Sequence, residues 1–115
     1  MTIENFLEQL KRSPESIEFD QVMNLIAEHY DYTPAAFSNG QTRNEAGTNE
    51  GSCKIFAFAK LNGLNQEETL ACFGKFYRED VLQHPDGDDH ANIRQFMLHG
   101  WAGVQFESMP IKLSE

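Results

Sequence analysis

The sequence has few basic side chains and no long apolar stretch. Its 115 residues include 9 Lys and Arg against 18 Asp and Glu, which gives a formal net charge of −9. Such a chain is repelled by nucleic-acid phosphates and by anionic membrane surfaces, so we expect neither as a partner. No apolar run approaches the roughly 18 residues of a membrane-spanning helix, and we expect no membrane span.

Cysteine is also scarce. Cys53 and Cys72 are too few for a disulfide framework, or for a zinc site without other ligands. The segment from Ile3 to Leu10 is amphipathic and lacks the continuous apolar core of a signal peptide. We therefore expect free thiols in a reducing cytoplasm. Cys72 is expected in the core.

What the sequence does contain is sufficient for one folded domain. Nine phenylalanines and an aromatic content of 11% provide core material. A chain of this length buries roughly 65% of its unfolded surface. We expect a single domain over residues 1–115, with an ordered core at about 2–107 and a C-terminal tail, 108–115, that frays from Pro110 onward.

The spacing of apolar residues is helical in most of the chain. It predicts a mainly α, compact bundle of about five helices, with Gly74 inside the fourth. Two short extended segments would pair as a small two-stranded β ribbon, and a long polar loop runs from Ser38 to Gly51. The predicted helices are Thr2–Arg12, Phe19–Tyr30, Cys53–Leu61, Asn65 to just before Pro85, and Asp89–His99; the predicted ribbon strands are Ala35–Phe37 and Gly103–Phe106.

The stretch from Asn44 to Leu61 joins the most polar loop to the most apolar run. Ser52 is the expected N-cap of the central helix. Two glycines before it leave backbone amides free, an arrangement that binds anions at helix N-termini, although Glu45 and Glu50 would repel a phosphate. The alternative is a loop whose side chains only cap and brace neighbouring elements.

Cys53 falls in the first turn of that helix, where the helix dipole favours the thiolate. With a histidine nearby in space it would form a nucleophile pair. The alternative is a small buried hydrophobic residue, because no local signature of a cysteine enzyme surrounds it.

A second polar cluster runs from His84 to His90. Its carboxylates and imidazoles are suitable ligands for a divalent metal, although their spacing does not match a calcium-binding EF-hand loop. In the alternative interpretation Asp88 or Asp89 caps the next helix and His90 is a partly buried histidine. The metal candidates are Asp86, Asp88, Asp89 and His90.

The two polar clusters each precede an apolar helix. If those helices pack side by side in parallel, the polar side chains at their starts converge into one site. The candidate ligand-binding residues are Asn44, Glu45, Asn49, Glu50, His84, Asp88, Asp89, His90 and Arg94, and the candidate catalytic residues are Cys53, His90 and Glu50.

The segments NEAGTNEGSCK (44–54) and HPDGDDHANIR (84–94), together with FSNG, ETLACFGKFYREDVL and HGWAGVQF, resemble the HopJ type III effector family over nearly the whole chain. The resemblance implies a bacterial protein delivered into host cells by type III secretion. It supplies no catalytic residues, because the family has no established enzymatic activity.

Two function classes remain open. The first is a non-enzymatic binding protein with a host or bacterial protein partner, or with a small ligand. The second is a housekeeping enzyme of the bacterial cytoplasm, such as a small metal-dependent hydrolase, with its site in the segments Asn44–Cys53 and His84–Arg94. Beyond that divalent metal we expect no cofactor, and the oligomeric state stays open.

Overall fold

The computed structural model describes residues 1–114. Within them no helix has the length and apolar character needed to cross a membrane. The α-helices are α1 (Ile3–Arg12), α2 (Phe19–His29), α3 (Glu50–Leu61), α4 (Gln66–Ala71) and α5 (Ala91–His99); two 3-10 turns, η1 (Pro14–Ser16) and η3 (Gly100–Gly103), and one π-helix, η2 (Phe76–Val81), join them. The strands are β1 (Tyr30–Tyr32), β2 (Phe37–Asn39), β3 (Thr42–Asn44), β4 (Val104–Phe106) and β5 (Ile111–Leu113).

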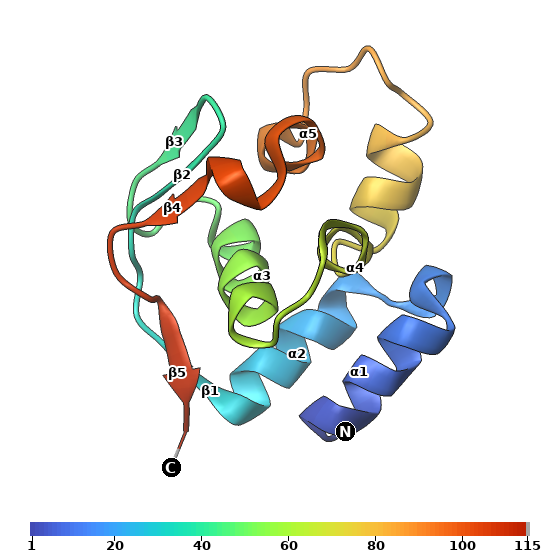
Figure 1. Cartoon of the computed structure of the whole chain (residues 1–115), viewed down its shortest axis with the longest axis vertical. Helices are drawn as coiled ribbons and strands as arrows, with labels where there is room; N and C mark the ends of the chain where they lie inside the picture. Colours follow the sequence, from blue (N-terminus) through green and yellow to red (C-terminus); the bar gives the residue numbers. More distant parts are fainter. Residues whose placement is uncertain (115) are drawn as a thin grey trace.

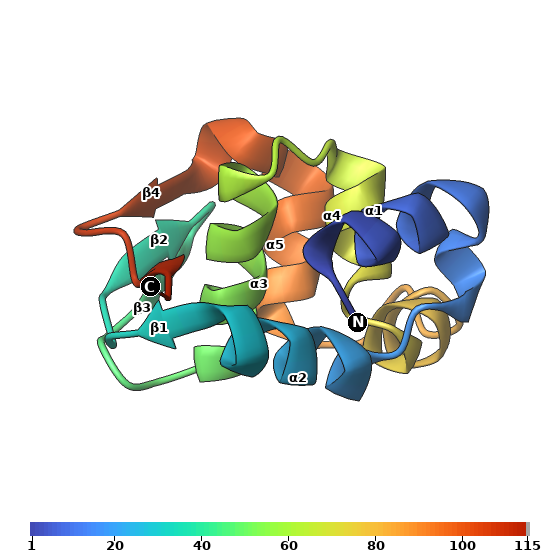
Figure 2. The same ribbon diagram turned by 90° about the horizontal axis from the view of Figure 1, so that it is seen from below.

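Helix α3 lies at the centre of the molecule. The other helices and the short strands surround it, and α5 runs alongside it (Figures 1 and 2). Ile55, Phe56 and Phe58 of α3 are all fully buried, as expected for a helix that is apolar nearly all round. The ring of Phe56 contacts the rings of Phe73 and Phe96 at centroid separations of 5.5 and 5.0 Å.

The fold is mixed α/β and not purely a helical bundle. Strands β3, β2 and β4 form an antiparallel sheet in that order, with Phe37 opposite both Asn44 and Phe106. The predicted pairing of the segments near Phe37 and Phe106 is therefore confirmed. The third strand arises because the two-residue loop Gly40–Gln41 closes a hairpin inside the predicted long polar loop.

The C-terminal segment differs from the expected frayed tail. Strand β5 pairs antiparallel with β1, with Tyr32 opposite Ile111. Ile111 is 2% exposed, and the amide of Thr33 donates to the carbonyl of Pro110 at 2.7 Å. Burial of Pro110 and Ile111, together with the pairing to β1, thus orders the chain as far as Leu113.

The predicted fourth helix is interrupted at Gly74. Helix α4 ends at Ala71 and η2 begins at Phe76. Gly74 has φ = 60°, and a Cβ there would lie 2.7 Å from the backbone nitrogen of Phe19. The glycine therefore permits close approach of this segment to the start of α2. The break also sets the direction of η2, which carries Phe76 and Asp80.

Candidate functional site

Helices α3 and α5 both begin after a residue in the left-handed conformation. Asn49 precedes α3 with φ = 48°, and His90 precedes α5 with φ = 51°. Over residues 1–114 these are the only non-glycine residues with positive φ. The predicted caps were therefore wrong: Ser52 lies inside α3, and neither Asp88 nor Asp89 occupies the N-cap position of α5. At the starts of both helices, tertiary contacts hold the backbone in the left-handed conformation. These contacts outweigh the local preference for a serine or aspartate cap.

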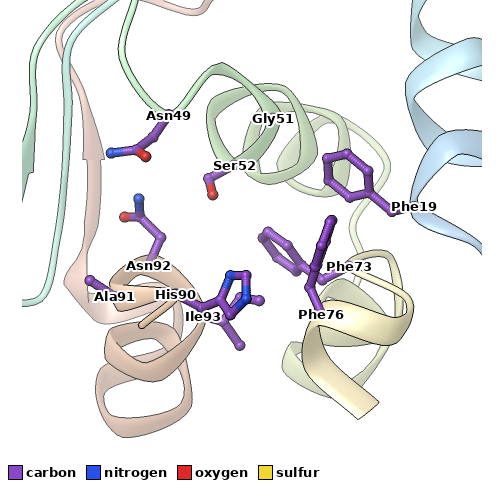
Figure 3. Close-up of a pocket in the computed structure, with 10 residues that line it drawn as sticks. All are labelled: Phe19, Asn49, Gly51, Ser52, Phe73, Phe76, His90, Ala91, Asn92 and Ile93. Atoms are coloured by element: carbon purple, nitrogen blue, oxygen red, sulfur yellow. The ribbon is translucent and has the colours of Figure 1, made fainter. Parts of the chain in front are cut away.

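The two helix starts meet at one pocket of about 320 Å³. Figure 3 shows Asn49, Ser52 and Asn92 on one side, an aromatic wall opposite, and His90 between them. The expected convergence of the two segments is therefore present, and of the candidate residues Asn49 and His90 line the pocket. None of the candidate carboxylates is among the lining residues, which are Phe19, Asn49, Gly51, Ser52, Phe73, Phe76, His90, Ala91, Asn92 and Ile93.

Buried amide side chains connect this pocket to the sheet. Asn44 Oδ1 accepts from Asn49 Nδ2 at 2.8 Å and from Asn92 Nδ2 at 2.9 Å. Asn92 Oδ1 accepts from Asn44 Nδ2 at 3.0 Å and from Asn39 Nδ2 at 3.1 Å. Asn39, Asn44 and Asn92 are at most 5% exposed. Because buried amides are costly without partners, this network fixes the starts of α3 and α5 relative to the hairpin.

His90 is held in place by a carboxylate. Its Nε2 lies 3.0 Å from Asp80 Oδ2, on η2, and 3.8 Å from Asp89 Oδ2. The ring also packs against Phe76, with 5.2 Å between the centroids. A histidine whose one nitrogen bonds a carboxylate has a fixed orientation, and its other nitrogen is free to meet a ligand.

Arg94 organises the loop before α5 and not the pocket. Its guanidinium donates to the Asp89 backbone carbonyl at 2.6 Å, to Asp89 Oδ1 at 2.7 Å and to the carbonyl of His84 at 3.0 Å. The hydrogen bond from Arg94 lowers the pKa of the Asp89 carboxyl below its usual value. His84 contributes its backbone here, while its side chain is exposed.

The remaining carboxylate candidates are exposed. The Glu45 carboxylate accepts a hydrogen bond from Arg43 at 3.4 Å. The same Arg43 also pairs with Glu107 at 2.6 Å. Glu50, Asp86 and Asp88 lie on the surface. Over residues 1–114 no three His, Cys, Asp or Glu side chains gather closely enough to hold a metal ion.

Both cysteines are free and buried. Cys53 is 1% exposed, and burial raises the pKa of its thiol, because desolvation outweighs the stabilisation expected at a helix start. Burial raises the pKa of Cys72 to about 12. Both environments favour the thiol form over the thiolate that a cysteine nucleophile needs.

Several residues of the site were not among the sequence candidates. Asn92 and Asp80 lie within predicted helices, where a polar side chain usually faces water. Phe19, Phe73 and Phe76 belong to apolar stripes that serve equally well as core. The signal that points to Asn92 is its position in the HPDGDDHANIR motif beside His90; no local signal identifies the other four.

Comparison with known proteins gives a consistent assignment. The family model described as HopJ type III effector protein matches residues 3–111. A crystal structure entitled "unknown function protein VPA0580" superimposes with a TM-score of 0.98 at 57% identity, covering 99% of this chain and 95% of that one. No curated protein matches the chain.

Proposed function

The chain belongs to the HopJ type III effector family, and we propose that it is a binding domain that holds a small ligand in the pocket between the starts of α3 and α5. The pocket volume of about 320 Å³ lies within the usual range for small-molecule sites. A few convergent polar groups facing an aromatic wall are also typical of such sites.

The observation that carries this proposal is the pair of left-handed residues. Asn49 and His90 each adopt a conformation that costs about 1–3 kcal/mol, and they come from separate segments of the chain. Strained backbone of this kind clusters at ligand sites, where it positions side chains. Here both residues line one pocket, so a single binding role accounts for both.

The two sides of the pocket define the ligand chemistry. The side chains of Asn49, Ser52 and His90 offer hydrogen bonds, and the positive ends of two helix dipoles favour an acceptor or a single negative charge. Phe73 and Phe76 favour a flat apolar body. The net charge of −9 opposes a phosphate. The best match is a small aromatic or alicyclic molecule with a carboxylate or carbonyl group.

A fragment library of such acids, amides and neutral analogues tests the proposal by protein-observed NMR. Binders should shift the amide resonances of Gly51, Ser52 and Ala91 and raise the melting temperature. Asn49→Gly relieves the left-handed strain but removes the hydrogen bond to Asn44. Because these two effects oppose each other, the variant should keep nearly the same stability while binding at least tenfold more weakly. Leu98→Ala, outside the pocket, should bind as the wild type does. Binders that shift only other regions, or no binder at all, would overturn the proposal.

The hydrogen bond between His90 and Asp80 favours a second candidate, a hydrolytic enzyme at the same pocket. A histidine oriented by a carboxylate is the arrangement of a general base, here for a water molecule attacking an ester or amide. Turnover of chromogenic esters or amides, lost in both His90→Gln and Asp80→Asn, would support it. If ligands bind at the pocket but none of these substrates is hydrolysed, the protein is a binding domain and not a hydrolase.

A further inference from the structure

A second hollow lies on another face of α5 and shares no lining residue with the ligand pocket. It has a volume of about 390 Å³ and runs between the end of η2 and the outer face of α5. We call it the α5 groove; its lining residues include Val81, Leu82, Pro85, Arg94, Met97 and Leu98.

Apolar side chains in the α5 groove are exposed to an unusual degree. Leu98 is 73% exposed, Leu82 47% and Met97 37%. Single exposed apolar residues are common on protein surfaces, whereas several gathered in one hollow mark an interaction site. Helix α5 already buries Ile93 and Phe96 on its inner face, so Met97 and Leu98 have no role in the core.

Hydrogen bonds hold one wall of the groove in place. Arg94 has only 16% of its side chain exposed, and its hydrogen bonds to Asp89 and His84 hold the loop that carries Pro85. A Cβ on Gly87 would lie 2.7 Å from Arg94 Nη2, so the loop packs closely around the guanidinium. A preformed hollow loses less entropy on binding than a flexible surface.

Charge identifies the kind of partner. The only cation among the groove-lining residues is Arg94, which is paired with Asp89 at 2.7 Å. The segment 79–89, which contributes Val81, Leu82 and Pro85 to the groove, carries further carboxylates, and the whole chain has a net charge of −9. A second copy of this chain and an anionic membrane are therefore both repelled. A partner with lysine or arginine beside its apolar residues is attracted.

From the exposed apolar hollow and its acidic surround, we propose that the α5 groove docks an amphipathic helix of a partner protein. In this complex, aliphatic side chains of the partner helix, at helical spacing, insert between Leu82 and Leu98. Basic residues of the partner flank them and face Asp86 and Asp88. This site acts independently of the ligand pocket, and each can be lost without the other.

A display library of helical 16-residue peptides, with varied apolar and flanking positions, tests the proposal against the full chain. Selection should enrich peptides with lysine or arginine on the flanks. An enriched peptide, resynthesised, should bind Leu98→Asp at least tenfold more weakly than the wild type. Leu113→Asp is the matched control, because Leu113 is also exposed, at 61%, but lies on β5; it should bind normally.

A second experiment reverses the charge beside the groove. The double variant Asp86→Lys, Asp88→Lys should weaken the basic peptide and strengthen a version with glutamate flanks. Enriched peptides with acidic flanks, or equal binding to Leu98→Asp, would overturn the proposal. So would a concentration-dependent dimer of the wild type that Leu98→Asp abolishes, because the groove would then be occupied by a second copy.

Discussion

Gly74 combines two constraints in one residue. An alanine there would have to adopt φ = 60°, and its Cβ would meet the backbone nitrogen of Phe19 at 2.7 Å. We expect Gly74→Ala to lower the free energy of unfolding by about 2–4 kcal/mol, measured by urea denaturation. Gly63→Ala is the control, since Gly63 has φ = 67° but open space around its Cβ position; it should lose about 1 kcal/mol. Equal losses would show that the contact with α2 is unimportant.

The buried amides form a unit at the same scale. Asn44 and Asn92 exchange two hydrogen bonds, of 2.9 and 3.0 Å, in the interior. We expect Asn44→Ala and Asn92→Ala each to lower stability by about 1–3 kcal/mol, because partners are left unsatisfied. The double variant should lose less stability than the two single variants lose in total. The difference, which is the coupling energy between the two amides, should be about 1 kcal/mol or more. Additive losses would mean that the two amides act separately.

The sequence predicted single residues well where local chemistry decides. Thr2 caps α1 by accepting from the amide of Asn5 at 3.0 Å, and Asn65 forms a capping box with Glu68. Both are common capping patterns that lie within four residues of the helix start, so a short sequence window is enough to recognise them. It failed at Asn49 and His90, whose left-handed conformations depend on contacts with distant segments. Such contacts are not encoded in a short sequence window, so local sequence patterns do not identify the two left-handed positions.

At the scale of elements, the loop before α5 depends on the pairing of Asp89 with Arg94. The pKa of Asp89 is lowered in the folded chain, so its contribution to stability is present above the unfolded pKa of about 4 and is lost as pH falls through the folded value. We expect Asp89→Asn to have a lower free energy of unfolding than the wild type at neutral pH, and this difference in free energy to become smaller as pH falls below about 4. Urea titrations at each pH measure it.

Asp86→Asn serves as the control for that experiment, because it makes the same change in net charge within the same loop. If it reproduced the pH dependence of Asp89→Asn, long-range charge and not the contact with Arg94 would be responsible.

Element types were largely predictable, because helical spacing holds over long windows. The exceptions have specific causes. The hairpin β2–β3 is too short for a periodic signal. The end of α4 depends on the approach of Gly74 to α2, which no window around Gly74 reveals. The sequence does not determine whether two packed helices run parallel or antiparallel. The meeting of the starts of α3 and α5 therefore depended on the assumption that the two helices are parallel. The aromatic wall of the pocket was hidden for the same reason, as its rings come from α2, α4 and η2 and their flanks.

At the scale of the whole molecule, β5 closes the C-terminal segment onto β1 near the N-terminal helices (Figure 1). Its side chains differ sharply in burial, with Ile111 2% and Leu113 61% exposed. We expect Ile111→Ala to lower the free energy of unfolding by about 2–4 kcal/mol, because it leaves a cavity in the shared core. Leu113→Ala should change it by less than about 0.5 kcal/mol.

Truncation after Glu107 tests the contribution of the whole C-terminal segment. It removes Ile111 and the strand pairing together, so its cost should equal or exceed that of Ile111→Ala, and the backbone amides of Tyr30 to Tyr32 should lose protection in hydrogen exchange. The backbone amides of Asn92 and Ile93, at the pocket, should remain protected from hydrogen exchange. Their protection should fall only as far as the lower global stability of the truncated chain requires. A truncated chain as stable as the full one would show that β5 is only laid on the surface, and that the core is complete without it.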